Sequence, residues 1–401
     1  MTTSSAPLSR RRSARLLDAV VVGGGMVGAA AALALGRAGL AVSLVEAREP
    51  RPWQPADEVD LRVVALAPSS ARLLQELGVW EAIRDVRAQP YRHMRVWDAA
   101  NGAELDFDAA HEGRQALGWI VENRLIQHCL WQALASAGVE RYCPASVSRF
   151  DAADDHVHLA LADGQTLDAR VLVAADGAAS PLRQQAGIAT HGHAYGQRAV
   201  VAHVTTEKPH ADTAWQRFLP GGPIALLPLA DGRSSIVWTL PEAEAARVQA
   251  LDDGAFADAV GVASDFRLGR ITGTTPRASF PLKLQLATSY QSGRLVLTGD
   301  AAHVVHPLAG QGVNLGLRDV AELRDAMLAA HEAGRDVGNT ATLRRYARRR
   351  HADATLDARG IDLLGHAFGV KAKPLAALRG LGVATIDASP LKQLLNTRAA
   401  G

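Results

Sequence analysis

The feature that most constrains the fold of this chain is a glycine-rich loop near its N-terminus. Gly23, Gly25 and Gly28 have the G-x-G-x-x-G spacing of the dinucleotide-binding fingerprint. The valine-rich run before the loop predicts a buried parallel strand over 18–22, and the Ala/Leu-rich run after it predicts a helix over 27–38. With a second apolar run over residues 40–45, the sequence predicts a βαβ unit with a right-handed crossover.

Each glycine of the loop has a role that a side chain would obstruct. Gly23 makes the tight turn, Gly25 lets a diphosphate approach the backbone, and Gly28 allows the helix to pack closely on the strand. The second apolar run ends at Glu46, whose carboxylate can accept hydrogen bonds from an adenosine ribose and would repel a 2′-phosphate. The loop therefore predicts a dinucleotide other than NADP, and by itself it leaves NAD and FAD open.

A second glycine-rich region far along the chain favours FAD. A strand expected over 295–297 leads into Gly299-Asp300, and the stretch 307–314 opens a helix. The aspartate can bind polyol hydroxyls, although an acid here can also cap a helix. A flavin needs this second half-site because its ribityl chain and ring extend well beyond the diphosphate. We therefore expect FAD.

A third motif, Asp176-Gly177 followed by Ser180-Pro-Leu-Arg183, completes an ordered set spanning most of the chain. With these motifs the chain resembles the flavoprotein aromatic hydroxylases of the para-hydroxybenzoate hydroxylase fold. It resembles the ubiquinone-biosynthesis ring hydroxylases in particular. The stretches that carry this narrower resemblance are 60–66, 77–80, 121–123, 222–229, 303–316 and 343–346.

The resemblance implies a set of cofactor-binding residues. They are Gly23, Gly25, Gly28, Glu46, Arg62, Asn123, Asp176, Gly177, Asp300, Gly312, Val313 and Asn314. It also implies that Pro307, Gly310, Gln311 and Gly312 border the flavin ring. No acid or base is assigned. His303 and His306 flank the motif, where packing and loop orientation are favoured over a proton relay.

The implied activity is that of an FAD-dependent monooxygenase. It would hydroxylate the aromatic ring of a polyprenyl phenol or benzoquinol in ubiquinone biosynthesis through a flavin C4a-hydroperoxide, using NAD(P)H and O2. The alternatives are an FAD-dependent hydroxylase of another aromatic substrate, a flavin halogenase or reductase, and a flavin-bound non-catalytic subunit of a biosynthetic complex. The sequence contains no Trp-x-Trp-x-Ile-Pro halogenase motif. The ring position and the natural electron donor stay open.

The expected fold class is α/β, with a Rossmann-like FAD-binding domain interleaved with a β-sheet substrate domain and a helical C-terminus. The expected divisions are a flexible tail at 1–17, an FAD-binding domain at 18–90, 112–190 and 284–360, a β-rich domain at 91–111 and 191–283, and a C-terminal helical segment at 361–401. Further helices are expected at 68–80, 120–137 and 313–359, and strands within 91–107 and at 157–161, 166–172, 199–204, 216–219, 224–229 and 234–240.

The β-rich domain is expected to cover the flavin with an apolar substrate pocket. Phe218, Leu226, Pro228 and Trp238 are the candidates for this pocket, and plain sheet core is the alternative for each of them. Ring hydroxylation requires such a pocket because water must be excluded while the ring carbon is held close to the flavin.

Composition excludes several classes of protein. A formal charge of +2 gives no argument for nucleic acid, and two cysteines give neither a disulfide framework nor a zinc spacing, so no metal site is expected. No apolar run approaches the roughly 18 residues that span a bilayer. We expect a cytoplasmic protein acting on a lipophilic quinone precursor.

Two C-terminal features leave partners open. The arginine run at 344–350 is typical of a solvated face, with peripheral contact to the inner membrane as the alternative. The segment 361–395 would bind the membrane or a ubiquinone-biosynthesis complex, or it would close the back of the flavin domain. The acid-free start of the chain, 1–15, is interpreted as a tail, with a transit peptide as the alternative.

Overall fold

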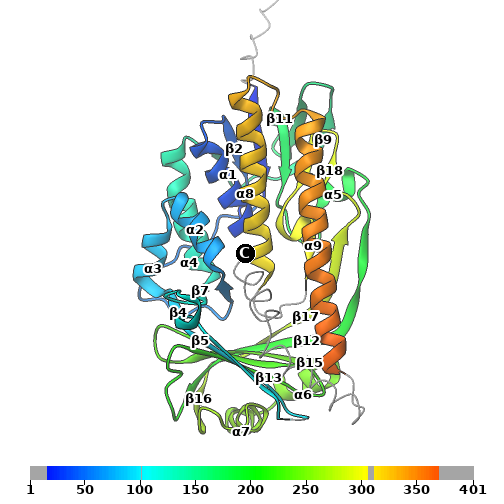
Figure 1. The fold of residues 1–401 in the computed structure, drawn as a ribbon. Helices are drawn as coiled ribbons and strands as arrows, with labels where there is room; N and C mark the ends of the chain where they lie inside the picture. Colours follow the sequence, from blue (N-terminus) through cyan, green and yellow to red (C-terminus); the bar gives the residue numbers. More distant parts are fainter. Residues whose placement is uncertain (1–15, 101, 306–310, 370–401) are drawn as a thin grey trace, which may run out of the picture.

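The computed structural model describes residues 16–100, 102–305 and 311–369, with the side chains of 112, 311 and 361–369 left out. Figure 1 shows an α/β part at one end and a β-rich part at the other, with two long helices running beside them. The α/β fold class expected from the sequence is confirmed.

The predicted βαβ unit is present. Strand β1 (Leu17–Val22) is followed by helix α1 (Met26–Arg37) and by strand β2 (Val42–Val45), which pairs with β1 in parallel. The unit forms the centre of an eight-stranded sheet. Its other strands are β8 (Glu140–Tyr142), β9 (Val147–Ala152), β10 (Val157–Leu161), β11 (Thr166–Ala174), β18 (Gln291–Ser292) and β19 (Leu295–Leu297).

The order of the central strands places the distant motifs together. Strand β11 pairs in parallel with β1 on one edge and with β19 on the other. The carboxyl ends of parallel strands meet at one edge of a sheet, so the loops after β1, β11 and β19 lie side by side. These loops carry the three glycine-containing motifs.

A nine-stranded sheet forms the β-rich part. Its strands are β5 (His93–Asp98), β6 (Glu104–Asp108), β12 (Thr190–Thr206), β13 (Thr213–Phe218), β14 (Ile224–Pro228), β15 (Ser234–Pro241), β16 (Ile271–Thr274), β17 (Ala278–Ala287) and β20 (His303–Val304). Helices α6 (Glu242–Gln249) and α7 (Asp253–Ala263), which the sequence analysis did not predict, pack on one face of it. A three-stranded sheet of β3 (Val63–Leu66), β4 (Gln89–Tyr91) and β7 (Gly118–Glu122) lies between the parts.

Three predicted helices differ from the observed ones. The helix expected at 68–80 is two helices, α2 (Pro68–Glu76) and α3 (Trp80–Arg87), because Gly78 between them has φ +60°. The helix expected from 120 begins at 123 as α4 (Asn123–Leu134), after strand β7. The region 313–359 contains α8 (Gln311–Glu332) and part of α9 (Thr340–Gly369), separated by a turn at Gly334.

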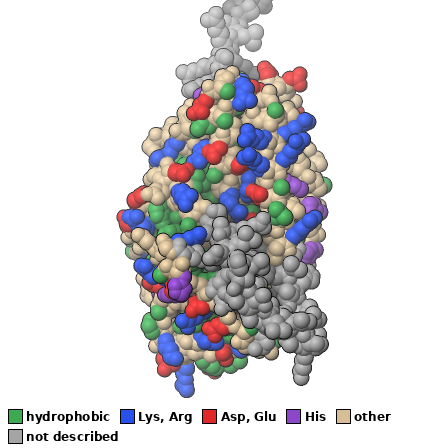
Figure 2. Space-filling view, in the orientation of Figure 1, with side chains coloured by type: hydrophobic (Ala, Val, Ile, Leu, Met, Phe, Trp, Pro, Cys, Tyr) green, Lys and Arg blue, Asp and Glu red, His purple; other side chains and the backbone are tan. Residues whose placement is uncertain are grey.

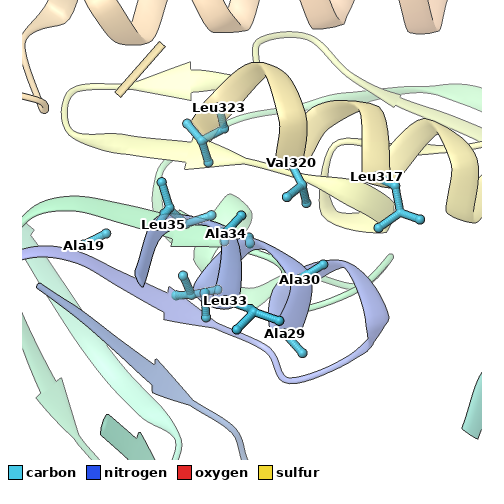
Figure 3. Packing of buried hydrophobic residues seen from close by; sticks show 14 of the residues in the cluster. Ala19, Ala29, Ala30, Leu33, Ala34, Leu35, Leu317, Val320 and Leu323 are labelled. Carbon is cyan, nitrogen blue, oxygen red and sulfur yellow. The ribbon is translucent and has the colours of Figure 1, made fainter. Parts of the chain in front are cut away.

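Helices α1 and α8 pack closely against each other. Figure 3 shows Ala30 and Ala34 of α1 facing Leu317 and Val320 of α8, and all four side chains are buried. The small side chains of α1 allow the two helices to approach closely. This packing places α8 beside the helix that follows the glycine loop. Within the described ranges, no helix is long and apolar enough to cross a membrane.

Candidate functional site

A cavity of about 630 Å³ lies between the α/β part and the β-rich sheet. Residues from widely separated parts of the sequence line it. They include Gly25, Gly28, Arg62, Asn123, Gly177, Asp300, Gly312 and Val313 from the predicted cofactor set, together with Val201, Ser235, Val237, Phe280 and Lys283 from the sheet. The fold therefore brings most of the predicted cofactor residues to one space.

The first glycine loop has the geometry that its fingerprint requires. Gly23 has φ +106°, and a Cβ atom there would collide with the carbonyl oxygen of Ala175. A Cβ at Gly28 would collide with the carbonyl of Gly23. At Gly25, by contrast, nothing lies within 4 Å of an added Cβ, so this backbone faces open space at the start of α1. The exposed backbone N–H groups at the start of a helix favour binding of a negatively charged diphosphate.

Two side chains of α4 hold this loop, and the sequence analysis missed them. Gln127 Nε2 and Trp131 Nε1 each donate to the carbonyl oxygen of Gly24 at 2.7 Å. Glu46 Oε2 accepts from the Gly24 amide on the other side of the same residue. Their spacing in the sequence could have indicated this role. Gln127 and Trp131 follow Asn123 by four and eight positions, and residues at that spacing lie on the same side of a helix.

Arg62 and Asn123 lie together at the cavity. The backbone N–H of Asn123 donates to the carbonyl oxygen of Arg62 at 3.0 Å. The side-chain Oδ1 of Asn123 is buried and has no hydrogen-bond partner in the described part of the chain. The Arg62 guanidinium lies 5.6 Å from the centre of the Phe280 ring. Since buried polar atoms are nearly always hydrogen-bonded, Asn123 points to a polar ligand in the cavity.

The two predicted aspartates have pKa values above the ordinary value. The Asp300 carboxyl faces the cavity, and surrounding protein raises its pKa, against the opposing charges of His303, Arg62 and Lys283. Burial also raises the pKa of Asp176. Asp176 Oδ2 accepts from the Leu182 amide at 3.1 Å, while Oδ1 has no partner among the described residues.

Asn314 is placed differently from the expectation. Its Oδ1 accepts from the Ala67 amide at 2.9 Å and from the Ser70 hydroxyl at 2.7 Å, and its Nδ2 donates to the Ala65 carbonyl at 2.8 Å. The side chain thus links α8 to β3 and to the residues that follow it, and it does not line the cavity.

The other predicted residues are placed as follows. Glu46, Gly23 and Asp176 lie beside the cavity lining, and Gln311 begins α8. Pro307, Gly310 and His306 lie outside the described residues.

The predicted substrate residues do not line the cavity. Leu226 and Trp238 pack in a core with Phe256 of α7, on the face of the sheet away from the α/β part. Side chains alternate between the two faces of a strand, and Pro228 follows Leu226 by two positions in β14, so both lie on the same face. The prediction placed these three residues on the wrong face of the sheet. That face is buried by helices α6 and α7, which the sequence analysis did not predict.

Val201, Ser235 and Val237 form the sheet wall of the cavity instead. Val201 pairs with Val237 across β12 and β15, so the two valines lie on the same face. Phe218 is buried at the end of β13, where it pairs with Asp98 of β5, and does not line the cavity. The part of the wall formed by β12 and β15 is therefore apolar with one hydroxyl, and β17 adds Phe280 and the charged Lys283.

His303 belongs to a buried ionic group beneath the Gly299–Asp300 turn. Its Nε2 lies 2.7 Å from Asp319 Oδ2, and Arg350 Nε donates to Asp319 Oδ1 at 2.7 Å. The Gly299 amide donates to the same carboxylate at 2.9 Å. Burial alone raises the pKa of Asp319, but His303 and Arg350 outweigh it and the pKa is lowered. His303 is thus a packed partner of Asp319, as the sequence analysis favoured.

These residues fit FAD as a ligand. The open backbone at Gly25 and Gly312 suits close approach by phosphate and ring, because nothing lies within 4 Å of an added Cβ at either glycine. Buried acceptors without partners, the Asp300 carboxyl and the apolar wall suit a polyol and a flat ring. No cluster of His, Cys, Asp or Glu within the described ranges could hold a metal ion.

Comparison with known proteins agrees with this arrangement. Residues 17–358 match the family described as an FAD binding domain. The 3-demethoxyubiquinol 3-hydroxylase of Escherichia coli is 39% identical over 367 residues, covering 91% of this chain and 93% of the relative. Ubiquinone hydroxylase UbiL of Rhodospirillum rubrum is 36% identical, covering 96% and 90%. Human mitochondrial ubiquinone biosynthesis monooxygenase COQ6 is 37% identical, covering 94% and 91%.

Solved structures show the same fold at lower identity. The p-nitrophenol 4-monooxygenase PnpA of Pseudomonas putida has a TM-score of 0.76 and 20% identity, covering 96% of this chain and 98% of its own. Klebsiella pneumoniae HpxO, solved with FAD and uric acid, has a TM-score of 0.72 and 19% identity, covering 96% of each chain. From the matched domain and the high coverage of its relatives, the chain belongs to the FAD-binding flavoprotein family that includes the ubiquinone-biosynthesis ring hydroxylases.

Proposed function

We propose that this chain is an FAD-dependent monooxygenase that hydroxylates the ring of a polyprenyl phenol or benzoquinol in ubiquinone biosynthesis. The observation that carries the proposal is the cavity, in which predicted cofactor residues face an apolar wall. The names of the relatives support the substrate class, since all three act in ubiquinone metabolism.

The cofactor assignment follows the two half-sites. The loop at Gly23, Gly25 and Gly28 would bind the diphosphate, with Glu46 at the adenosine ribose. Asp300 would bind ribityl hydroxyls. Arg62, Asn123, Asp176, Gly177, Gly312 and Val313 would complete the site. Pro307, Gly310 and Gln311 remain proposed neighbours of the ring.

When bound and reduced, FAD supplies the activation of O2 for transfer of one oxygen atom to an electron-rich ring. The protein has to hold the ring carbon close and keep water away. Val201, Val237 and Phe280 present apolar surface for this purpose. No side chain is required as a nucleophile, and we assign none as an acid or base.

NAD(P)H is the proposed electron donor. The sequence has one dinucleotide fingerprint, so the donor would bind transiently without a Rossmann domain of its own. Supply of electrons by another protein is the alternative. A test is the rate of flavin reduction by NADPH or NADH under anaerobic conditions, with and without a phenol.

The nine-stranded sheet supports the proposed division into cofactor and substrate parts, because β5 and β6 belong to the same sheet as strands β12 through β17. This sheet extends slightly past the expected limits of 190 and 283, since β12 starts at Thr190 and β17 continues to Ala287. The C-terminal segment 361–401 lies mostly outside the described residues.

Peripheral contact with the inner membrane is proposed for the start of α9. Arg344, Arg345, Arg348 and Arg349 are exposed there, and Arg349 pairs with Glu322 at 2.8 Å. Figure 2 shows Lys and Arg side chains gathered over the upper parts of α8 and α9. Such a surface attracts anionic lipid. Flotation with anionic vesicles should be lost in R344E/R348E, and unchanged flotation would exclude this surface.

The activity is tested with purified protein, NADPH, O2 and a prenylated phenol. The proposal expects O2 consumption that matches formation of a product heavier by one oxygen atom, together with rescue of a hydroxylase-deficient strain. A yellow protein that neither oxidises NAD(P)H faster with phenols nor rescues any such strain would indicate a non-catalytic flavin-bound subunit instead.

A further inference from the structure

The wall of the cavity contains a buried hydroxyl without a partner. Ser235 on β15 is 1% exposed and lines the cavity, and its Oγ has no hydrogen bond among the described residues. Val237, two residues further along the same face, is apolar. A buried hydroxyl left without a partner costs free energy, so its place in the cavity wall calls for a ligand that supplies the bond.

A buried histidine stands directly opposite this serine. His203 of β12 pairs with Ser235 in the antiparallel register, so their side chains lie on the same face of the sheet. His203 is 1% exposed, and its Nδ1 likewise has no partner among the described residues. Two polar atoms on one face, both buried and both unsatisfied, thus lie on neighbouring strands.

The other ring nitrogen of His203 is already engaged. Nε2 lies 3.0 Å from the carbonyl oxygen of Asp60, and a carbonyl can only accept, so Nε2 carries the proton. In the neutral ring Nδ1 is then an acceptor. Burial lowers the pKa of His203, which favours this neutral form.

We propose that Ser235, oriented by His203, binds the ring hydroxyl of the substrate. In the proposed substrate-bound state Nε2 of His203 keeps its bond to the Asp60 carbonyl oxygen, and the phenolic O–H donates to Ser235 Oγ. The Ser235 hydroxyl then turns to donate to His203 Nδ1, a bond that the described residues do not form without substrate. The serine would touch the substrate, whereas the histidine is a positioning residue. The arrangement selects a phenol over its methyl ether and fixes the ring relative to the flavin.

This inference rests on the proposed function, since it assumes a phenolic substrate. Binding is therefore measured separately from turnover. The probes are 2-prenylphenol and its methyl ether, and the readout is the change that each causes in the visible absorption of the FAD-bound protein. A neutral hydrogen bond predicts about a fivefold preference for the phenol.

The neighbouring serine provides a matched control. Ser234 is also buried with an unpartnered hydroxyl, but alternation along the strand places it on the opposite face. Ser235→Ala should abolish the preference, so that both probes bind alike, while Ser234→Ala should retain it. If Ser235→Ala keeps the full preference, or if both variants lose it equally, the inference is overturned.

A second variant tests the histidine. His203→Gln can still donate to the Asp60 carbonyl but offers no acceptor at the position of Nδ1. It should keep the melting temperature within a few degrees and reduce the preference for the phenol. An unchanged preference would remove His203 from the chain. If the natural protein itself binds neither probe, the proposed substrate class fails and not the assignment of Ser235 alone.

Discussion

Val27 in the first turn of α1 packs directly against Gly316 of α8. A Cβ atom added at Gly316 would lie 2.5 Å from Cγ2 of Val27 and 3.3 Å from Cα of Gly299. The backbone of the Gly299–Asp300 turn is therefore held between the first glycine loop and the helix that follows the second. Two half-sites from opposite ends of the sequence are in physical contact, and glycine is required where they meet.

The first prediction separates folding from cofactor binding within the glycine loop. Gly25→Ala adds a methyl group into open space, so the melting temperature should stay within a few degrees while FAD affinity falls about tenfold or more. Gly28→Ala introduces a collision with the Gly23 carbonyl and should lower the melting temperature. Calorimetry and titration with FAD measure the two effects. Equal behaviour of the two variants would contradict this division.

The second prediction concerns the donors that α4 supplies to the loop. Trp131→Phe and Gln127→Leu each remove one of two hydrogen bonds to the Gly24 carbonyl. Each should weaken FAD binding about fivefold, and the double variant should weaken it further, because a neutral hydrogen bond contributes about 1 kcal/mol. Cys129→Ser, on the same helix, is the control. FAD affinities equal to the control would show that these donors are dispensable.

The βαβ unit and the motif loops could be predicted from sequence because their signals are local. Valine runs, glycine spacing and helix punctuation act within about 30 residues of each other. The faces of the β-rich sheet could not be predicted in the same way. Choosing Val237 over Trp238 as a cavity residue requires knowing that α6 and α7 cover the face on which Trp238 lies, and both helices lie in sequence expected to be strand-rich.

Asn314 shows a second limit of sequence reasoning. A family motif predicts that a residue matters, but not whether it contacts the ligand or the protein. The three hydrogen bonds from Asn314 to residues 65–70 join segments far apart in the sequence, and only the folded arrangement reveals them.

The third prediction concerns the ionic group beneath the Gly299 turn. Asp319→Asn removes the buried carboxylate that pairs with His303 and Arg350, and it leaves the buried Arg350 only the more exposed Asp353 as a charge partner. The free energy of unfolding should therefore fall by about 3 kcal/mol. The pKa of Asp319 is lowered in the folded protein, so its contribution is present above the ordinary aspartate pKa and lost as pH falls through the lowered value. Urea unfolding at several pH values measures both effects. The control is Arg318→Gln, which breaks a more exposed pair with Asp357 between the same two helices.

The fourth prediction is a pH dependence of cofactor affinity. The pKa of Asp300 is raised, so on acidification the carboxylate becomes protonated at a pH above the ordinary aspartate value. FAD affinity should therefore begin to fall while aspartates with ordinary pKa values are still ionised. In the FAD-free protein the sign is opposite, because protonation of a group with a raised pKa stabilises the fold. Asp300→Asn should remove both trends, and an unchanged pH profile in that variant would assign them to another group.

The most direct test of the account is the stoichiometry of FAD binding to the FAD-free protein, measured by titration calorimetry. The two half-sites predict one FAD per chain, with affinity reduced about tenfold or more by Gly25→Ala and also by Asp300→Ala, although these residues belong to different motifs. Failure to bind FAD, or binding that Asp300→Ala leaves undiminished, would contradict the claim that the two motifs grip one cofactor.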